Sequence, residues 1–171
     1  MRASKENLMD VTCEYNQFCF FEEVNFLTIS GTARRTREDE DCSGDNFTVM
    51  EMNTGQTFMS ICDGMGSGKK DRQYSEMVID MLERLLESGF SESTSLKLIN
   101  SILLTGNQWQ EPAAVDMALI DQYSGICQFL KLGAACTYIK RGNWVECIKS
   151  TSLPMGVFEE VDVETITKKL Y

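Results

Sequence analysis

The sequence predicts an α+β fold built on antiparallel sheets, and three observations support this class. Short runs rich in β-branched and aromatic residues follow one another at turn-length intervals, and such short connections require antiparallel pairing. Two consecutive segments with helical spacing of their apolar residues interrupt these runs. The order of strands, helix pair and strands differs from the regular alternation that builds a parallel sheet. The chain has 171 residues, which suits a single core, so we assign residues 1–171 to one domain.

The N-terminal part of the chain is predicted to form a β-hairpin followed by a long loop. Met9–Phe21 and Val24–Ala33 are both rich in β-branched and aromatic side chains, and an acidic pair separates them. Arg34–Asn46 is polar and has no periodic apolar face, so we interpret it as an exposed loop.

A second hairpin is predicted around Asn53-Thr54-Gly55, where Asn and Gly supply the positive φ angles that a tight turn requires. Its strands are Phe47–Met52 and Gln56–Cys62. The second strand runs directly into a glycine-rich loop, Asp63-Gly64-Met65-Gly66-Ser67-Gly68.

Two helices are predicted after the glycine-rich loop. The first, Asp71–Ser88, ends before Gly89, a residue favoured just past a helix C-terminus. The second runs through Leu104 and starts at Ser91, whose hydroxyl can cap the first turn. The positions predicted to face the core are Met77, Met81, Leu82, Leu85 and Leu86 in the first helix, and Leu96, Leu98, Ile99, Ile102 and Leu103 in the second.

The C-terminal part is predicted to be a meander of antiparallel strands. Its strands are Val115–Asp121, Gly125–Leu132, Cys136–Lys140 and Trp144–Ile148, and Val157–Ile166 is interpreted as the approach to another. We expect the sheet that begins at Val115 to present an unpaired edge. Such an edge makes a second copy of this chain, in a homodimer, one candidate partner.

Charge and residue counts exclude several classes of function. The chain has 26 acidic and 16 basic side chains, a net charge of −10, which disfavours nucleic acid because binding it depends on neutralising phosphates. The absence of histidine excludes Ser-His-Asp and Cys-His catalysis and all imidazole metal sites. The seven cysteines include no C-x-x-C pair, so we interpret them as reduced thiols of a cytoplasmic protein. No apolar run approaches the roughly 18 residues that a membrane span needs.

Two carboxylates are the candidate catalytic residues. Asp45 precedes the first strand of the second hairpin and Asp63 follows its partner, so both are expected at the open end, about 5 Å apart. Carboxylates this close repel each other unless a cation lies between them. Hard oxygen ligands without His or Cys favour Mg²⁺ or Mn²⁺, and Gly64 lets a backbone carbonyl approach the metal.

The glycine-rich loop does not match a nucleotide-binding motif. Asp63 occupies the position where a phosphate-binding loop needs its first glycine, and Lys70 stands where Ser or Thr is required. Lys69 occupies the third glycine position of a dinucleotide-binding motif. We therefore reject a nucleotide site in this loop.

A set of ordered motifs resembles one family. The motifs are Gly31-Thr32-Ala33-Arg34, Ser43-Gly44-Asp45, Asp63-Gly64-Met65-Gly66-Ser67-Gly68, Leu85-Leu86-Glu87-Ser88-Gly89, Asn100-Ser101-Ile102-Leu103, Phe129-Leu130-Lys131-Leu132-Gly133, Lys140-Arg141-Gly142 and Leu153-Pro154-Met155-Gly156. They span nearly the whole chain. Together they resemble the stage II sporulation protein E branch of the metal-dependent protein phosphatases, the protein phosphatase 2C superfamily.

The resemblance implies a fold, a reaction and a partner. The fold is a sandwich of two antiparallel sheets between helices. The reaction is hydrolysis of phosphoserine or phosphothreonine on a partner protein, of the anti-sigma-factor-antagonist type in sporulation or stress signalling. Two Mn²⁺ or Mg²⁺ ions would be held by Asp45, by Asp63 as bridging ligand and by the backbone carbonyl of Gly64. The implied nucleophile is a metal-bound hydroxide.

One departure from the family pattern bears on the expected activity. Family members carry a further Ser-Asp-Gly segment with another metal-ligand aspartate, and nothing after Asp63 matches it. Three later aspartates lie in predicted strands or turns without the context of that segment; they are Asp116, Asp121 and Asp162. We therefore expect the C-terminal part of the domain to be missing and the metal centre of this chain to be incomplete. The alternative function is a non-catalytic fragment or pseudophosphatase that acts as a protein-interaction module.

Two points stay open at the level of sequence. Arg34, Arg35 and Arg37 either guide a phosphorylated partner or are simply solvated in an exposed loop. The full-length parent is either free in the cytoplasm or anchored to a membrane by segments outside this chain.

Overall fold

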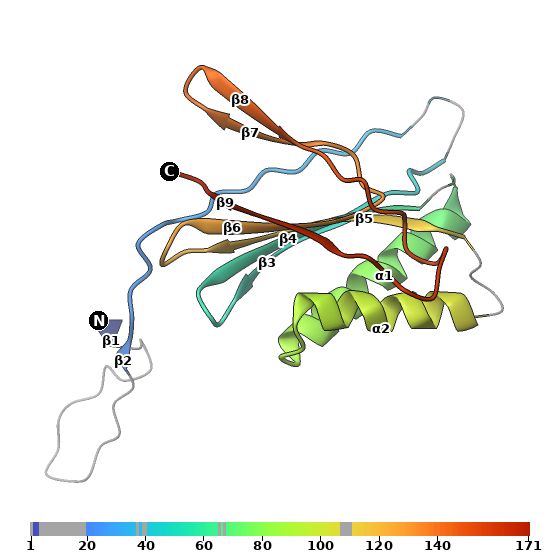
Figure 1. The fold of residues 1–171 in the computed structure, drawn as a ribbon, viewed down its shortest axis with the longest axis horizontal. Coiled ribbons are helices and arrows are strands. Elements are labelled where there is room, and N and C mark those ends of the chain that lie inside the picture. Colours follow the sequence, from blue (N-terminus) through green and yellow to red (C-terminus); the bar gives the residue numbers. More distant parts are fainter. Residues whose placement is uncertain are drawn as a thin grey trace, which may run out of the picture.

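The centre of the fold is a five-stranded antiparallel sheet in the order β3-β4-β5-β6-β9 (Figure 1). The structure, a computed structural model, describes residues 2–3, 20–36, 38, 41–64, 66, 68–106 and 111–171. The strands of the sheet are β3 (Asn46–Met52), β4 (Gln56–Gly64), β5 (Ala113–Asp121), β6 (Ile126–Leu132) and β9 (Glu164–Lys169).

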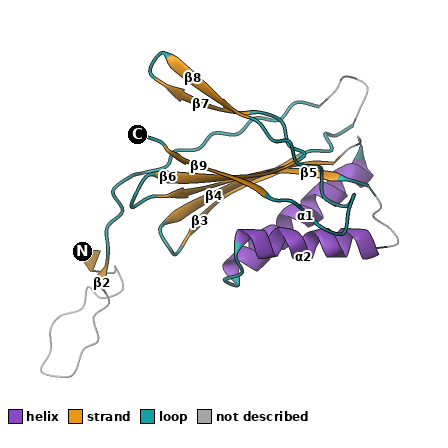
Figure 2. Cartoon of the chain, viewed as in Figure 1, coloured by secondary structure: helices purple, strands orange, loops and turns teal. Residues whose placement is uncertain are grey.

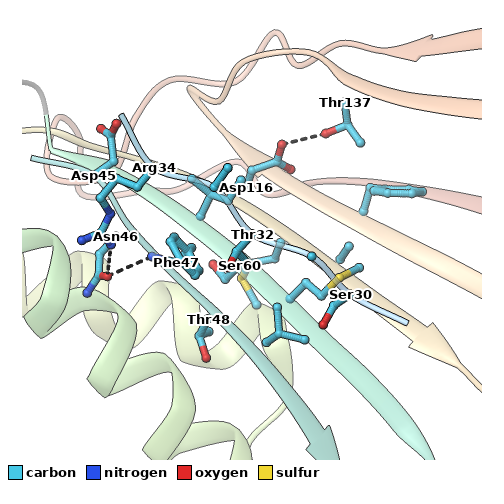
Figure 3. Close-up of a pocket in the computed structure, with 18 of the residues that line it drawn as sticks. Ser30, Thr32, Arg34, Asp45, Asn46, Phe47, Thr48, Ser60, Asp116 and Thr137 are labelled. Atoms are coloured by element: carbon cyan, nitrogen blue, oxygen red, sulfur yellow. Dashed lines mark hydrogen bonds between the residues drawn. The ribbon is translucent and has the colours of Figure 1, made fainter. Parts of the chain in front are cut away.

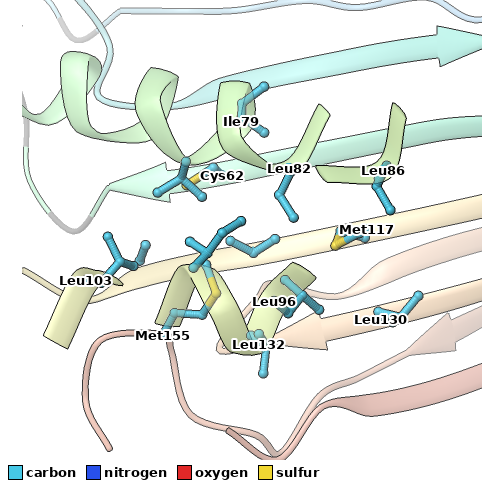
Figure 4. Packing of buried hydrophobic residues seen from close by; sticks show 14 of the residues in the cluster. Cys62, Ile79, Leu82, Leu86, Leu96, Leu103, Met117, Leu130, Leu132 and Met155 are labelled. Atoms are coloured by element: carbon cyan, nitrogen blue, oxygen red, sulfur yellow. The ribbon is translucent and has the colours of Figure 1, made fainter. Parts of the chain in front are cut away.

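Two helices, α1 (Lys69–Glu87) and α2 (Glu92–Thr105), cover one face of this sheet (Figures 1 and 2). Side chains alternate between the two faces along a strand, so every second residue of the central strands points at the helices. These residues and the inner stripes of both helices form the main hydrophobic core. Figure 4 shows part of it, including Cys62, Leu82, Leu96, Met117, Leu130 and Leu132.

The opposite face of the sheet carries different structure. β7 (Thr137–Arg141) and β8 (Trp144–Ile148) form a separate two-stranded hairpin on this side (Figure 1). A smaller hydrophobic cluster joins the hairpin to the sheet and contains Cys127, Phe129, Ile139 and Ile148. The extended segment of residues 22–36 also runs along this side. Two short strands, β1 (Arg2–Ala3) and β2 (Phe20–Phe21), pair with each other near the N-terminus.

The α+β class and the second predicted hairpin are confirmed. β3 and β4 pair antiparallel from Met52 opposite Gln56 outward to Asn46 opposite Cys62. β4 is longer than predicted because Asp63 and Gly64, expected in a loop, continue the pairing with β5.

Both predicted helices are confirmed to within two residues at each end, but their buried faces are rotated. In α1 the buried apolar residues are Tyr74, Val78, Ile79, Leu82 and Leu86, while Met77, Met81 and Leu85 are partly buried. In α2 the predicted core residues Leu98 and Ile102 are exposed, because only the stripe of Leu96, Ile99 and Leu103 contacts the core. The Ser91 cap is confirmed, since its hydroxyl accepts a hydrogen bond from the Thr94 backbone N–H.

The predicted strand Val24–Ala33 is wrong. This segment is extended but belongs to no ladder, and the backbone N–H groups of Asn25 and Phe26 donate to the carbonyl of Gln122. Leu27 is 78% exposed and Ile29 is 89% exposed, because no described strand lies alongside to bury them. Nearly all of Met9–Phe21 lies outside the described residues.

The predicted meander is interrupted after β6. The chain leaves the sheet there and forms β7 and β8 as a separate ladder, and β9 then takes the place beside β6. The edges of the large sheet are therefore β3 and β9. In the described part of the chain, neither helix has the length and apolar character needed to cross a membrane.

Candidate metal centre

The register of β3 and β4 puts the two predicted carboxylates at the same end of the hairpin. Asn46 pairs with Cys62, so the next position outward sets Asp45 across from Asp63. Both residues are exposed, and strand alternation places the Asp63 side chain on the face away from the helices. Burial, and then the charges of Asp63 and Asp45, raise the pKa of the Cys62 thiol to about 12. Both carboxylates therefore lie just beyond the last residue pair at the open end of the hairpin.

Ser43 orients the first carboxylate. Its hydroxyl donates a hydrogen bond to Oδ2 of Asp45 over 3.1 Å, and the Asp45 backbone N–H donates to the same hydroxyl over 3.3 Å. The Ser-Gly-Asp motif thus forms a small turn whose own hydrogen bonds limit the rotamers of Asp45.

The turns that carry the carboxylates pack tightly against the start of α1. A Cβ atom at Gly44 would lie 2.6 Å from the carbonyl oxygen of Gly66 and 3.2 Å from Cβ of Asp71. One at Gly66 would lie 2.7 Å from the carboxylate of Asp71. Ser75 of α1 also donates a 2.6 Å hydrogen bond to the Gly44 carbonyl. The glycines are needed here for close approach, so α1 fixes the backbone on which both carboxylates stand.

Asp71 is a buried acid that supports this packing. Desolvation raises the pKa of its carboxyl, and so does a hydrogen bond with the Glu111 side chain. The Tyr74 hydroxyl holds the Glu111 backbone by donating to its carbonyl over 2.5 Å. Sequence reasoning missed Asp71 and Ser75. The signal was present, because both share the helical stripe of Tyr74 and Val78 that faces the core.

The donor set fits a hard divalent cation. Asp45 and Asp63 offer charged carboxylate oxygens and Gly64 offers a carbonyl, which are the ligand types that Mg²⁺ and Mn²⁺ prefer. The Gly64 carbonyl accepts a 2.6 Å hydrogen bond from the Gly66 N–H, and a carbonyl has a second lone pair for a further partner. Among the described residues, no three or more side chains of His, Cys, Asp or Glu are grouped so that they could hold a metal ion.

Other aspartates of the chain have different roles. Asp116 lies on β5 and forms an ion pair with Lys131 at 2.5 Å. Asp121 accepts hydrogen bonds from the backbone N–H groups of Tyr123 and Ser124, and these bonds, Tyr123 first, lower the pKa of its carboxyl despite partial desolvation. Asp121, the last residue of β5, thus stabilises the turn that follows this strand.

A cavity of about 680 Å³ adjoins Asp45 and runs beneath residues 29–35 on the face away from the helices (Figure 3). Phe47, Asp116 and Thr137 are among the residues that line it. Arg34 ties the overlying segment to β3, because its guanidinium donates to Oδ1 of Asn46 over 2.8 Å and lies 5.1 Å from the ring centroid of Phe47. Of the arginines singled out from the sequence, Arg34 and Arg35 line this cavity, and Arg37 lies outside the described residues.

Comparison with known proteins places the chain in a family. A family model described as stage II sporulation protein E (SpoIIE) matches residues 53–171. The chain belongs to the stage II sporulation protein E family. Over 156 residues it is 33% identical to stage II sporulation protein E of Bacillus subtilis (strain 168), a match that covers 91% of this chain and 19% of that protein. The chain therefore spans about a fifth of the length of this relative.

Solved structures share the fold of this chain. The structure of the PP2C phosphatase domain and a fragment of the regulatory domain of SpoIIE from Bacillus subtilis is 37% identical and aligns with a TM-score of 0.67, covering 75% of this chain and 38% of that one. A bacterial serine phosphatase aligns with a TM-score of 0.65 at 19% identity, over 78% of this chain and 70% of that chain, which supports the fold alone. The implied architecture of antiparallel sheets and helices is confirmed by these matches.

Proposed function

We propose that this SpoIIE-family chain is part of a metal-dependent serine/threonine phosphatase domain that hydrolyses phosphoserine or phosphothreonine on a partner protein. The proposed ligands of two Mn²⁺ or Mg²⁺ ions are Asp45, Asp63 and the backbone carbonyl of Gly64. The proposed partner is a cytoplasmic phosphoprotein of the anti-sigma-factor-antagonist type. Membership of the sporulation family supports this choice of partner.

One observation carries the proposal: the β3–β4 ladder ends with Asn46 opposite Cys62, and Asp45 and Asp63 are the next residues outward on the two sides. Two adjacent carboxylates in an exposed position favour a cation between them, because otherwise they repel each other. The relation to a solved SpoIIE phosphatase domain supplies the reaction class.

The residues of this chain hold and orient the site. Ser43 directs the Asp45 carboxylate through its hydroxyl, and Ser75 holds the adjoining Gly44 carbonyl. The net charge of −10 disfavours an approaching phosphate, so its charge must be offset locally. Divalent ions held there would neutralise phosphate charge and make water a stronger nucleophile.

Removal of one carboxylate at a time tests the proposal. In a version of the chain extended by the Ser-Asp-Gly segment that the family pattern implies, we expect Asp45→Asn and Asp63→Asn each to lower turnover of a phosphoserine protein by about a hundredfold or more. Asp80→Asn is the matched control, because Asp80 is an exposed carboxylate on α1 remote in sequence from both. Turnover that persists in excess chelator, or in either site variant, would show that the site is misplaced.

The 1–171 chain itself should bind Mn²⁺ more weakly than the extended version and turn over substrate slowly or not at all. Affinity for hard cations rises with the number of charged oxygens that converge on the ion. Calorimetric titration with Mn²⁺ and a phosphatase assay on both versions give the comparison. Equal affinity and equal rate would contradict it. Retained binding of a phosphoprotein without turnover in either version would favour the alternative, a non-catalytic interaction module.

A further inference from the structure

A buried ionic network lies on the sheet face away from the helices, at the floor of the cavity. Lys131 of β6 has a fully buried side chain, and its ammonium donates to Oδ2 of Asp116 over 2.5 Å and to the hydroxyl of Thr137 over 2.8 Å. The Thr137 hydroxyl donates in turn to the same Asp116 oxygen over 2.7 Å (Figure 3). The three polar groups thus satisfy one another in a closed triangle.

The network joins two separate parts of the fold. Asp116 and Lys131 face each other in the β5–β6 ladder, whereas Thr137 is the first residue of β7. β7 pairs only with β8 in the described structure. The triangle is therefore a polar connection between the five-stranded sheet and the base of the β7–β8 hairpin.

The other end of the hairpin is attached in a weaker way. Arg141 donates to the backbone carbonyl of Lys169, and Lys168 forms an ion pair with Glu146. These side chains are between 20% and 33% exposed, and partly solvated ion pairs contribute little to stability. A fully buried ammonium is different, because it is costly without its partners and so demands that they stay in place.

The position of the hairpin base also shapes the cavity beside the candidate metal centre. Asp116, Thr137 and Asp45 all line this one cavity. A movement of Thr137 away from Lys131 would displace one wall of it. The sheet and helices would not need to move, because their core lies on the opposite face.

We propose that Lys131 is a positioning residue, an ionic latch that holds the β7–β8 hairpin against the sheet and thereby sets the width of the cavity that leads from Asp45. The latch is a property of the fold and stands by itself. Its effect on substrate binding rests on the proposed phosphatase function.

Hydrogen exchange on a matched pair of variants tests the latch. Thr137→Val removes the hydroxyl while keeping the shape, and Thr137→Ser keeps the hydroxyl. We expect amides of β7 and β8 in Thr137→Val to exchange about tenfold to a hundredfold faster than in the unaltered chain, because hydrogen bonds to charged groups are lost. Amides of β4 and β5 should keep their rates, and Thr137→Ser should behave like the unaltered chain. Unchanged exchange in Thr137→Val, or an equal increase throughout the sheet, overturns the latch.

Variants of Lys131 separate the latch from simple loss of stability. The double variant Lys131→Met with Asp116→Leu removes both charges, so no unpaired charge stays buried and the sheet should still fold. The hairpin should nevertheless exchange faster, since Thr137 has lost both partners. Lys140→Met, on an exposed position of β7, is the control and should change nothing. A double variant whose hairpin is as protected as that of the control would overturn the proposal.

The catalytic consequence is measured in the extended version of the chain. Thr137→Val should raise KM for a phosphoprotein about tenfold, whereas the control Lys140→Met should leave KM unchanged, because Thr137 lines the cavity and Lys140 does not. If the unaltered extended chain has no turnover, the proposed function fails while the exchange results still decide the latch. Equal KM values in Thr137→Val and the unaltered chain, with faster exchange, would confine the latch to the fold and refute its role in positioning substrate.

Discussion

The two faces of the five-stranded sheet are stabilised in different ways. On one face, α1 and α2 enclose a continuous hydrophobic core in which Leu82 and Phe58 are fully buried. On the other face, a small cluster around Ile139, a buried ion pair and an open cavity share the same area. The helix face therefore supplies most of the stability, and the open face is free to carry the site.

The candidate metal centre depends on both faces. The Asp63 side chain points away from the helices, but the backbone of its loop and of Gly44 is held by Asp71 and Ser75 of α1. Rigid support behind an exposed pair of carboxylates is what a metal site needs, since ligand geometry is set by the groups that hold the ligands. Substitutions on the helix face and on the open face should therefore change the properties of the protein in different ways.

The largest expected loss of stability comes from a substitution on the helix face. Leu82→Ala should lower the free energy of unfolding by about 2–5 kcal/mol, because it leaves a cavity in a closely packed core. Ile139→Ala, in the cluster beneath the hairpin, should cost less than about 2 kcal/mol, since that cluster is small and adjoins open space. Urea denaturation of both variants measures the difference. Equal losses of unfolding free energy would mean that the two faces contribute equally to stability, and the contrast between them would be wrong.

An intermediate effect is expected where the faces meet. Gly44→Ala should destabilise the protein by about 1–3 kcal/mol, because the added methyl group would lie 2.6 Å from the backbone oxygen of Gly66. Gly31→Ala is the control, since no atom lies within 4 Å of its added methyl group and its φ is not in the left-handed region. Chemical denaturation gives the stabilities, and Mn²⁺ titration should show weaker binding for Gly44→Ala alone. If Gly44→Ala changed neither the stability nor the Mn²⁺ affinity, α1 would not be what fixes the backbone of the site.

The last effect is absent at neutral pH and develops only as the pH becomes alkaline. Burial raises the pKa of the Cys62 thiol, on the helix face, and of the Cys127 thiol, on the open face, to about 12 in each case. Above the ordinary pKa of 9.0 the unfolded chain loses these protons while the folded chain keeps them, so stability should fall as pH rises from there toward about 12. Each thiol contributes up to about 1.4 kcal/mol per pH unit.

Single alanine variants show how much each thiol contributes to the dependence of stability on pH. Cys62→Ala and Cys127→Ala should each reduce the dependence of the urea midpoint on pH, whatever their effect at neutral pH. Equal reductions indicate that both faces unfold together. A smaller reduction for Cys127→Ala would show that the hairpin opens before global unfolding, which would sharpen the contrast between the faces. No reduction for Cys62→Ala would contradict the assigned pKa.

The elements with regular periodicity were predictable from the sequence, whereas their tertiary partners were not. The register of the β3–β4 hairpin, which ends one residue inside Asp45 and Asp63, follows from the turn at residues 53–55 and the pairing rule alone. The buried face of α1 was misjudged because Met77 and Tyr74 are both apolar enough to face a core, and packing against β4 decides between them. The segment 24–33 has strand-like residues but no neighbour, and a strand exists only by pairing.

The buried ion pair could have been found from the sequence. A lysine at the centre of Phe129-Leu130-Lys131-Leu132 is anomalous in an apolar strand, and the turn at residues 123–125 sets it opposite Asp116. The link to Thr137 could not be predicted, because it depends on where the chain goes after leaving the sheet. The burial of Asp71 could have been inferred from the helical stripe that it shares with Tyr74 and Val78, but its contacts with Gly44 and Gly66 could not, since these glycines are distant in sequence.

The contact between α1 and Gly44 also bears on the order in which parts of the chain fold. The hydrogen bond from Ser75 joins residues that are 31 positions apart, whereas the β3–β4 hairpin closes around a short local turn. Closing a long loop costs more chain entropy, so local pairing precedes distant docking. We expect the hairpin to bring the two carboxylates near each other early, while their backbone becomes fixed only when α1 docks. The ability to bind a cation tightly would then arise late, as one of the final events in the folding of the chain.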